Sequence, residues 1–289
     1  VIVAAPTGIA DINAGCVTLH SLLQLPFGTF IPENIALTDS GINVNTPQTL
    51  FRERKMNSTK RKMLREMELL IIDEVSMLRA DLLDCIDLVL RNARWRKNEP
   101  FGGVQILFIG DLLQLPPVVK DEEKALLQPF YDSHYFFDAR VLKQIPLVKI
   151  ELKDVYRQSE QTFIDLLNRM RYNNISSDDL QLLNKYYKPK LTESELEGFI
   201  HLTTHNYKAD QINQKRLDAL DTSLEIYEAG VSGDFAENMY PTVYKLALKV
   251  GAQIMFIKND PSGEGKFYNG KIGKVKSLKK HAVLISLEE

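Results

Sequence analysis

The segment LLIIDEVSM, from Leu69 to Met77, constrains the fold of this chain more than any other. Its apolar part is too short for a buried helix and is rich in Leu and Ile, which predicts a parallel strand covered on both faces. Asp73 and Glu74 follow that strand directly. Because open α/β sheets bind ligands at the carboxyl edge of their strands, we expect this acidic pair to lie at a ligand site.

The acidic pair has a chemical and a structural interpretation. Two carboxylates at such an edge can hold Mg²⁺ and activate water for nucleotide hydrolysis, whereas a structural pair only complements the dipole of a helix's first turn. A second strand of the same kind, from Val104 to Ile109, ends in Gly110 and Asp111. Two polar strand ends at one sheet edge favour the chemical interpretation.

Gln114 follows the second strand closely and is the next polar residue with two possible roles. Its amide can donate to one oxygen and accept from another, which suits contact with a γ-phosphate or with the attacking water. The alternative is a structural residue that caps a loop stiffened by Pro116 and Pro117. Gln114 alone does not distinguish the two.

Composition limits the class of protein. The 289 residues suggest about two domains, and the 44% apolar content supplies sizeable cores without a run long enough to cross a membrane. Cys16 and Cys85 are isolated thiols without the spacing of metal ligands. This pattern favours a reduced intracellular setting over a disulfide framework, and we expect neither a membrane protein nor a zinc site.

The formal net charge is −2, but phosphates respond to local rather than global charge. Seven Lys or Arg against two Glu lie between Phe51 and Glu66, and four cations surround Trp95 between Arg91 and Lys97. Either cluster suits a phosphate backbone. The alternatives are a solvated loop or helix face for the first cluster, and the cationic carboxyl end of a helix for the second.

Apolar runs near 1–5, 68–73 and 104–110 alternate with helical patterns, which predicts a first doubly wound domain over residues 1–140. Residues 25–66 interrupt this alternation with Pro, Gly, Asn and charged residues, so we interpret them as a projecting insertion. A helix is expected from about Ala80, with these apolar residues on one face: Leu82, Leu83, Ile86, Val89 and Leu90.

A second α/β domain is predicted over residues 141–289. Its strands are expected at 145–152 and 198–204, with a helix after each. Beyond Lys249 the chain turns to short apolar runs and Gly-rich turns, which predicts the start of a small β module at about 265–289.

Six segments, taken in chain order, resemble the motifs of the Pif/RecD-like branch of superfamily-one DNA helicases, and the match is closer to Pif than to RecD. They are APTGIADINAG (Ala5 to Gly15), VTLHSLL (Val17 to Leu23), IIDEVSM (Ile71 to Met77), PFGGVQ (Pro100 to Gln105), GDLLQLPPV (Gly110 to Val118) and VYRQ (Val155 to Gln158). A helix and basic loop between IIDEVSM and PFGGVQ look like the Pif signature segment. The resemblance extends at least to FYNGKIGKV (Phe267 to Val275), so it spans almost the whole chain.

The resemblance implies an α/β fold with two RecA-like P-loop NTPase domains, each a parallel sheet with helices on both faces, and a small SH3-like β module. It implies ATP and Mg²⁺ as cofactors. Asp73 is then expected to hold Mg²⁺ through its water shell, Glu74 to orient the attacking water, and Gln114 and Arg157 to sense the γ-phosphate. Without the resemblance, the sequence favours an ordinary surface arginine at Arg157.

The resemblance also implies single-stranded DNA and duplex or fork DNA as partners of a monomeric motor that moves 5′ to 3′. Its motifs place DNA contacts at Pro6, Thr7, Gly8, Thr18, His20, Thr203, His205 and Asn206. Without the resemblance, His20 is interpreted as a structural hydrogen-bonding residue and Asn206 as a helix N-cap. Such a helicase is cytoplasmic in a bacterium, and nuclear or mitochondrial in a eukaryote.

The resemblance assigns the insertion at 25–66 to the wedge that meets the duplex fork. Phe27 and Phe30 are then candidates for contact with bases. A small satellite core under the insertion explains both aromatic residues equally well.

Two family features are absent from the sequence. No Gly-Lys pair is followed by Ser or Thr, so there is no G-x-x-x-x-G-K-[ST] phosphate loop, and the last Arg is Arg216, so the final 73 residues (289 − 216) lack an arginine finger. We expect a chain truncated at both ends that, as written, hydrolyses ATP negligibly. The competing interpretation is a non-catalytic single-stranded-DNA-binding module or accessory subunit. VTLH and PFGGVQ argue against another kind of P-loop ATPase.

Overall fold

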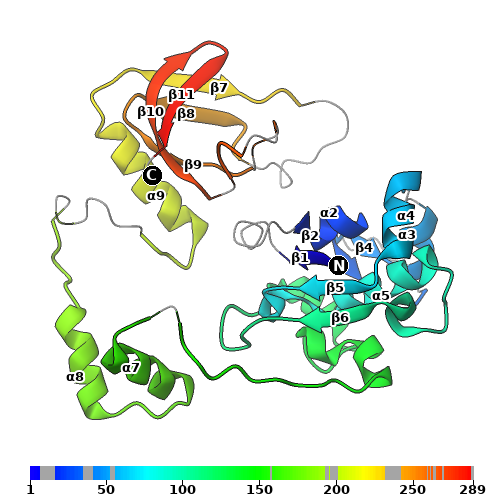
Figure 1. The fold of residues 1–289 in the computed structure, drawn as a ribbon. Coiled ribbons are helices and arrows are strands. Elements are labelled where there is room, and N and C mark those ends of the chain that lie inside the picture. Colours follow the sequence, from blue (N-terminus) through cyan, green and yellow to red (C-terminus); the bar gives the residue numbers. More distant parts are fainter. Residues whose placement is uncertain are drawn as a thin grey trace. The chain divides into compact units, whose positions relative to one another are not determined.

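The structure is a computed structural model. It describes residues 1–6, 17–34, 42–52, 56–156, 158–192, 195, 201–231, 242–258, 260, 262, 265–268 and 270–287. The chain divides into two compact units, Val1–Asp154 and Val155–Glu289 (Figure 1). None of the helices in the described ranges has the length and apolar character that a membrane span requires.

The first unit is built on a parallel sheet of four strands in the order β2, β1, β5, β6. The strands are β1 (Ile2–Ala5), β2 (Val17–Thr18), β5 (Leu69–Ile72) and β6 (Gln105–Phe108). The three strands predicted near 1–5, 68–73 and 104–110 are therefore confirmed. Because all four strands run in the same direction, their carboxyl ends meet at one edge of the sheet.

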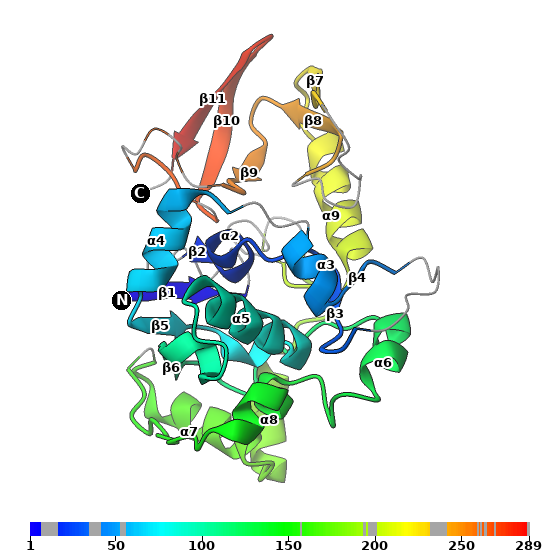
Figure 2. The same ribbon diagram turned by 90° about the vertical axis from the view of Figure 1, so that its right-hand side faces the viewer.

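One face of this sheet carries the core of the unit. Leu70 and Ile72 are fully buried there, and the predicted helix from Ala80 is confirmed as α5 (Ala80–Ala93), which packs its apolar side against them (Figure 2). Leu69 and Ile71, which alternate with them along β5, are only half-buried, and Leu107 on the neighbouring strand β6 is 45% exposed. Within the described residues of this unit, the helices thus join the core on one face of the sheet.

Three buried aspartates of α5 hold neighbouring segments in place. Asp81 accepts a hydrogen bond from the backbone N–H of Phe30 (3.0 Å), and Asp87 accepts one from the N–H of Phe101 (2.6 Å). Asp84 accepts from the N–H groups of two consecutive residues, Arg140 and Val141, at 3.0 and 2.9 Å. Burial raises the pKa of Asp84 and of Asp87 above the ordinary value, although these hydrogen bonds act in the opposite direction.

The insertion predicted at 25–66 folds onto the same core. It contains a parallel pair, β3 (Thr29–Phe30) and β4 (Val44–Asn45), followed by α3 (Pro47–Arg52) and α4 (Ser58–Glu66). Phe30, Leu50 and Leu64 are buried in the main core of the unit, so no separate satellite core is needed to explain Phe30. Phe27, by contrast, is 57% exposed.

The remaining short elements of the first unit connect or follow these strands. They are α2 (Leu19–Leu23), α6 (Asp121–Leu127) and four 3₁₀ helices, η1 (Val75–Met77), η2 (Pro100–Gly103), η3 (Phe136–Asp138) and η4 (Arg140–Gln144). The strand predicted at 145–152 is wrong, because residues 145–156 have no regular secondary structure. Val148 is 90% exposed, and no described strand pairs with this segment.

The second unit combines helices with antiparallel strands. Its elements are α7 (Gln161–Arg171), α8 (Ser177–Tyr186), α9 (Asn206–Asp218), β7 (Leu224–Glu228), β8 (Lys245–Lys249), β9 (Gln253–Met255), β10 (Ile272–Lys279) and β11 (Ala282–Leu287). β7 pairs with β8, and β9, β10 and β11 form a three-stranded sheet, of which β10 and β11 lie within the range predicted for the β module and β9 precedes it.

The parallel strand predicted at 198–204 is not formed in its described part. Residues 201–204 are not a strand, and residues 198–200 lie outside the described residues. All strand pairs described in this unit are antiparallel. The apolar pattern at 198–204 therefore does not by itself indicate a parallel sheet here.

Candidate functional site

The acidic pair lies at the carboxyl edge of the parallel sheet. The backbone N–H of Asp73 donates to the carbonyl of Ala4 (2.9 Å), and the N–H of Val75 donates to the carbonyl of Ile109 (3.0 Å). The turn after β5 is thus held between the ends of β1 and β6. This geometry is the one expected from two polar strand ends at a single edge.

Glu74 adopts an unusual backbone conformation. Its φ of 52° and ψ of 42° lie in the left-handed region, which a non-glycine residue rarely occupies and which often marks a functional site. The N–H of Glu74 donates to Oδ1 of Asp73 (2.8 Å). Neither the Glu74 carboxylate nor Oδ2 of Asp73 has a hydrogen-bond partner among the described residues, so these oxygens remain available to a ligand.

Gly110 is required by the close approach of the two strand ends. A Cβ on this residue would lie 2.8 Å from the backbone nitrogen of Val75 and 3.0 Å from its Cγ1. Only glycine lets the end of β6 pass so near the turn that carries Glu74. Gly110, just after the end of β6, thus helps to position the acidic pair.

Gln114 lies on an exposed turn just beyond β6. Its backbone N–H closes that turn by donating to the carbonyl of Asp111 (3.0 Å), and Oδ1 of Asp111 accepts from the N–H of Leu113 (3.1 Å). The Gln114 side chain has no hydrogen bond to a described residue, so the structure gives no support to the loop-capping alternative. An exposed, unengaged amide near the acidic edge is compatible with a sensor of phosphate.

Ser76 is a polar residue that sequence reasoning did not single out. Its side chain is buried, and its Oγ has no hydrogen-bond partner within the part of the chain that the structure describes. The carboxylates of Asp73 and Glu74 in the same turn supply oxygen atoms, the type of ligand that Mg²⁺ and its water shell require. The residues present therefore fit a magnesium-bound phosphate.

Thr18 and His20, two of the predicted DNA contacts, lie at the junction of β2 and α2 and not on one extended segment. Thr18 ends β2 and its Oγ1 accepts from the N–H of Ser21 (3.1 Å), which caps α2, while His20 already belongs to that helix. The His20 ring stacks on Phe27 with centroids 5.4 Å apart and 12° between the planes. Burial, and then the charge of Arg79, lower the pKa of His20, so the ring is neutral at neutral pH.

The second-unit residues assigned to DNA lie at the start of α9 and are exposed. His205, rather than the predicted Asn206, is the N-cap residue, and Asn206 is the first residue of the helix. Oγ1 of Thr204 and Nδ1 of His205 are 2.8 Å apart, and the His205 ring meets Tyr207 edge-on at 5.6 Å. These side chains form an exposed polar and aromatic cluster on one loop.

Several predicted site residues lie outside the described residues. They are Thr7, Gly8 and Arg157. Pro6, which precedes the first two, is half-buried directly after β1 at the same sheet edge as Asp73.

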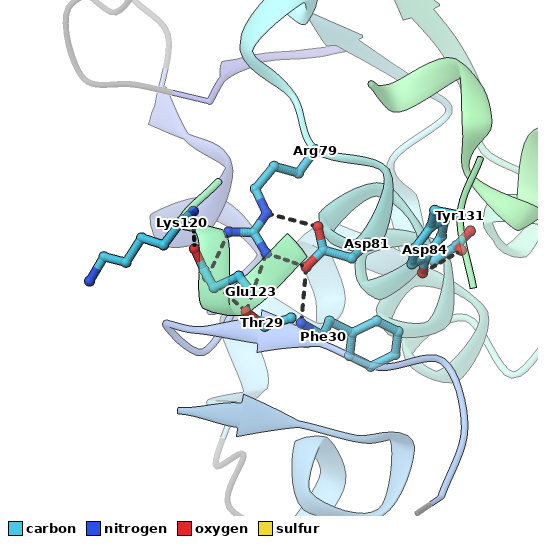
Figure 3. Close-up of polar contacts among 8 residues, drawn as sticks. All are labelled: Thr29, Phe30, Arg79, Asp81, Asp84, Lys120, Glu123 and Tyr131. Carbon is cyan, nitrogen blue, oxygen red and sulfur yellow. Dashed lines mark hydrogen bonds and ion pairs between the residues drawn. The ribbon is translucent and has the colours of Figure 1, made fainter. Parts of the chain in front are cut away.

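Figure 3 shows an ion-pair network that the sequence did not reveal, centred on Arg79, the residue before α5. Arg79 donates to both carboxylate oxygens of Asp81 at 2.9 Å and to Oε1 of Glu123 at 2.9 Å. Thr29 also donates to Glu123 Oε1 (2.7 Å). The network joins the start of α5 to β3 of the insertion and to α6, and no spacing in the sequence pointed to it.

The basic cluster at 91–97 is in part structural. Arg94 donates to the carbonyls of Gly102, Leu64, Arg65 and Met67, and therefore caps the end of α4. Arg91 donates to both oxygens of Asp87 at 2.8 and 2.7 Å. Arg91 and Arg94 are therefore bound within the protein near the carboxyl end of α5, as the structural interpretation of this cluster expects.

Comparison with known proteins agrees with the motifs. A profile of the PIF1-like helicase family matches residues 1–181. Over 287 residues the chain is 31% identical to the ATP-dependent DNA helicase PIF1 of Saccharomyces cerevisiae strain YJM789, a match that covers 95% of this chain and 30% of that protein. The human ATP-dependent DNA helicase PIF1 is 31% identical over 279 residues, covering 95% of this chain and 39% of the human protein.

Among solved structures, Bacteroides Pif1 bound to single-stranded DNA matches with a TM-score of 0.80 and 39% sequence identity. The match covers 99% of this chain and 62% of that chain. The chain spans about a third of the length of the curated relatives it matches. The Pif resemblance inferred from the motifs and the α/β fold class are confirmed, and the chain belongs to the PIF1-like helicase family.

Proposed function

We propose that the full-length protein is an ATP-dependent DNA helicase that moves 5′ to 3′ along single-stranded DNA and unwinds duplex DNA. The observation that carries this proposal is the acidic pair, Asp73 and Glu74, with unengaged carboxylate oxygens at the carboxyl edge of a parallel sheet. Relatives in the family support it, because Bacteroides Pif1 has been solved with single-stranded DNA and with ADP-AlF3.

In this proposal each residue of the edge has its own task. Bound ATP would supply the γ-phosphoryl group that is transferred to water, and Mg²⁺ would offset the charge on the phosphate oxygens. Asp73 holds the hydrated cation, and Glu74, turned by its left-handed backbone, orients the attacking water. Gln114, with its unengaged amide, and Arg157 of the second unit sense the γ-phosphate.

The DNA contacts of the proposal follow the two loops at the sheet edge and the start of α9. Thr7 and Gly8 offer backbone N–H donors, Pro6 offers a van der Waals surface on the same loop, and His20 offers a neutral ring beside the exposed Phe27. Thr203, His205 and Asn206 continue the contacts on the second unit. A solved relative concerns unwinding of forked double-stranded DNA by two coordinating Pif1 helicases; we propose that each motor here is a monomer acting on such forks.

The test is DNA-stimulated ATP hydrolysis by the full-length protein carrying Glu74→Gln. Loss of the carboxylate that orients water should lower turnover by about 100-fold or more while single-stranded DNA binding is kept. The matched control is Glu122→Gln, which removes the same charge from an exposed position on α6. Undiminished hydrolysis by the Glu74 variant would remove that residue from the proposed role.

A further inference from the structure

Trp95 occupies a backbone position that normally belongs to glycine. It follows the last turn of α5 with a φ of 62°, and its N–H donates to the carbonyl of Asn92 (3.3 Å) while the N–H of Arg96 donates to that of Arg91 (3.0 Å). This is the Schellman pattern of helix termination, in which the left-handed residue is usually Gly. A tryptophan placed there strains the backbone, and such strain often marks a binding residue.

The Trp95 ring is 77% exposed, so burial in the core does not explain why a large aromatic residue is placed there. The Arg65 guanidinium lies over the ring at 5.7 Å from its centroid. Arg65 is fixed in turn by a hydrogen bond from its Nε to the carbonyl of Ala93 (3.1 Å). The result is a prearranged pair of an aromatic surface and a cation.

This pair lines a hollow of about 250 Å³ between α4 and the end of α5. Its lining residues, which define the Trp95 hollow, are Phe51, Met56, Arg61, Arg65, Asn92, Ala93 and Trp95. Two arginines of the basic cluster predicted at 51–66 and the tryptophan of the cluster at 91–97 therefore line one site. The Arg61 side chain has no hydrogen bond or ion pair with any described residue, so its charge is available to a ligand.

The Trp95 hollow lies at the edge of the sheet opposite to the acidic pair. α4 leads into the start of β5, and α5 begins beyond the end of β5 and returns toward the start of β6. With 14 residues in α5, the two edges are separated by about 20 Å along this helix. The hollow is thus distinct from the proposed nucleotide site.

We propose that the Trp95 hollow is a second binding site for single-stranded DNA, in which a base stacks on Trp95 and the adjoining phosphates pair with Arg61 and Arg65. An exposed aromatic ring beside cations is the combination that binds single strands without sequence preference. The flat ring and the overlying guanidinium suit a nucleobase better than an acidic peptide, which needs no aromatic surface. The inference rests on the proposed function only in taking DNA as the partner.

The test uses the 289-residue chain, in which Trp95 is the single tryptophan and hence the only source of tryptophan fluorescence. A labelled oligothymidine is titrated into the protein, with anisotropy of the label reporting binding and tryptophan emission reporting stacking. We expect emission to be quenched as the oligonucleotide binds. Trp95→Gly should bind about tenfold more weakly and Trp95→Phe close to wild type.

Trp95→Gly separates binding from folding. Because glycine is favoured at the left-handed position, this variant should melt at the wild-type temperature or above it while it binds about tenfold more weakly. A variant that melts lower and binds as tightly as wild type would give Trp95 a purely structural role and overturn the proposal.

The charged part of the site is tested by Arg61→Gln, with Lys62→Gln as the matched control on the same helix. Arg61 lines the hollow, whereas Lys62 lies next to it in sequence and pairs with Glu66. Arg61→Gln should reduce the salt dependence of binding by about 0.7 in log–log slope, the value for one phosphate contact of a single strand, and Lys62→Gln should leave it unchanged. If both substitutions changed the salt dependence of binding equally, Arg61 would act only as a nonspecific surface charge, and the proposed binding site would be contradicted.

Other outcomes distinguish this inference from the proposed function. Saturating anisotropy without quenching overturns the Trp95 hollow as a DNA site but leaves DNA binding by the protein intact. Absence of any binding by the wild-type chain also overturns the Trp95 hollow, whereas the proposed function is tested separately by ATP hydrolysis of the full-length protein. Quenching by a polyglutamate peptide and not by the oligonucleotide would replace DNA with an acidic protein partner.

Discussion

The guanidinium of Arg79 donates to both carboxylate oxygens of Asp81, each at 2.9 Å (Figure 3). The two side chains are 16% and 2% exposed, so the pair is largely removed from water. Oδ2 of Asp81 also accepts the backbone N–H of Phe30 (3.0 Å). This one pair therefore attaches the insertion to the helix that begins beside the acidic turn.

Asp81→Asn should destabilise the first unit. It removes one of the two carboxylates that Arg79 faces and weakens the buried acceptor of the Phe30 N–H, while Arg79 keeps its ion pair with Glu123, so the expected cost is about 1–3 kcal/mol. Urea unfolding of the chain measures this free energy. The control is Asp121→Asn, whose carboxylate pairs with Lys124 at an exposed position and should change stability little. Equal effects of the two substitutions would contradict the role assigned to Asp81.

Glu123 predicts a pH dependence of stability. Burial acts to raise its pKa, but hydrogen bonds from the Lys120 N–H, Thr29 and Arg79 outweigh it and lower the pKa from 4.5 to about 2. A carboxyl group whose folded pKa is lowered stabilises the protein above its unfolded pKa, and this contribution is lost as pH falls through the folded value.

The difference in melting temperature between wild type and Glu123→Gln should therefore be constant from neutral pH to about 4.5 and shrink between 4.5 and about 2. Thermal melts of both proteins across this range provide the measurement. A difference in melting temperature that does not change with pH would show that the ionisation of Glu123 does not contribute to the stability of the folded protein.

Gly110→Ala should impair catalysis by the full-length protein through the backbone. The added Cβ would lie 2.8 Å from the nitrogen of Val75, so the turn that carries Glu74 must shift. A displacement of about 1 Å at a catalytic group lowers turnover by roughly 100-fold. Gly230→Ala is the control, since its Cβ would meet no atom within 4 Å. Normal DNA-stimulated ATP hydrolysis by the Gly110 variant would show that the turn tolerates the shift.

The sequence predicted the elements whose signal is local. The apolar runs at 68–73 and 104–110 form parallel strands, and the one-sided pattern after Ala80 forms α5. The acidic pair could be placed at the sheet edge for the same reason, because a parallel strand fixes which end carries the ligand.

Features that depend on long-range partners could not be predicted. The alternating pattern at 145–152 suits a strand, but no described strand lies beside it and the segment stays irregular. Asp81, Asp84 and Asp87 look like the polar face of a surface helix, and only the folded loops show that they accept buried backbone donors. The basic residues around Trp95 indicate an exposed position, but nothing in the sequence indicates its left-handed backbone conformation.

Unwinding of a forked duplex by the full-length protein tests the central claim most directly. The account predicts ATP-dependent strand separation when the loading strand has a 5′ single-stranded tail, no separation with a 3′ tail alone, and loss of the activity in Asp73→Asn. Unwinding that proceeds without ATP, that prefers the 3′ tail, or that survives loss of the Asp73 carboxylate would contradict a motor driven 5′ to 3′ from this sheet edge.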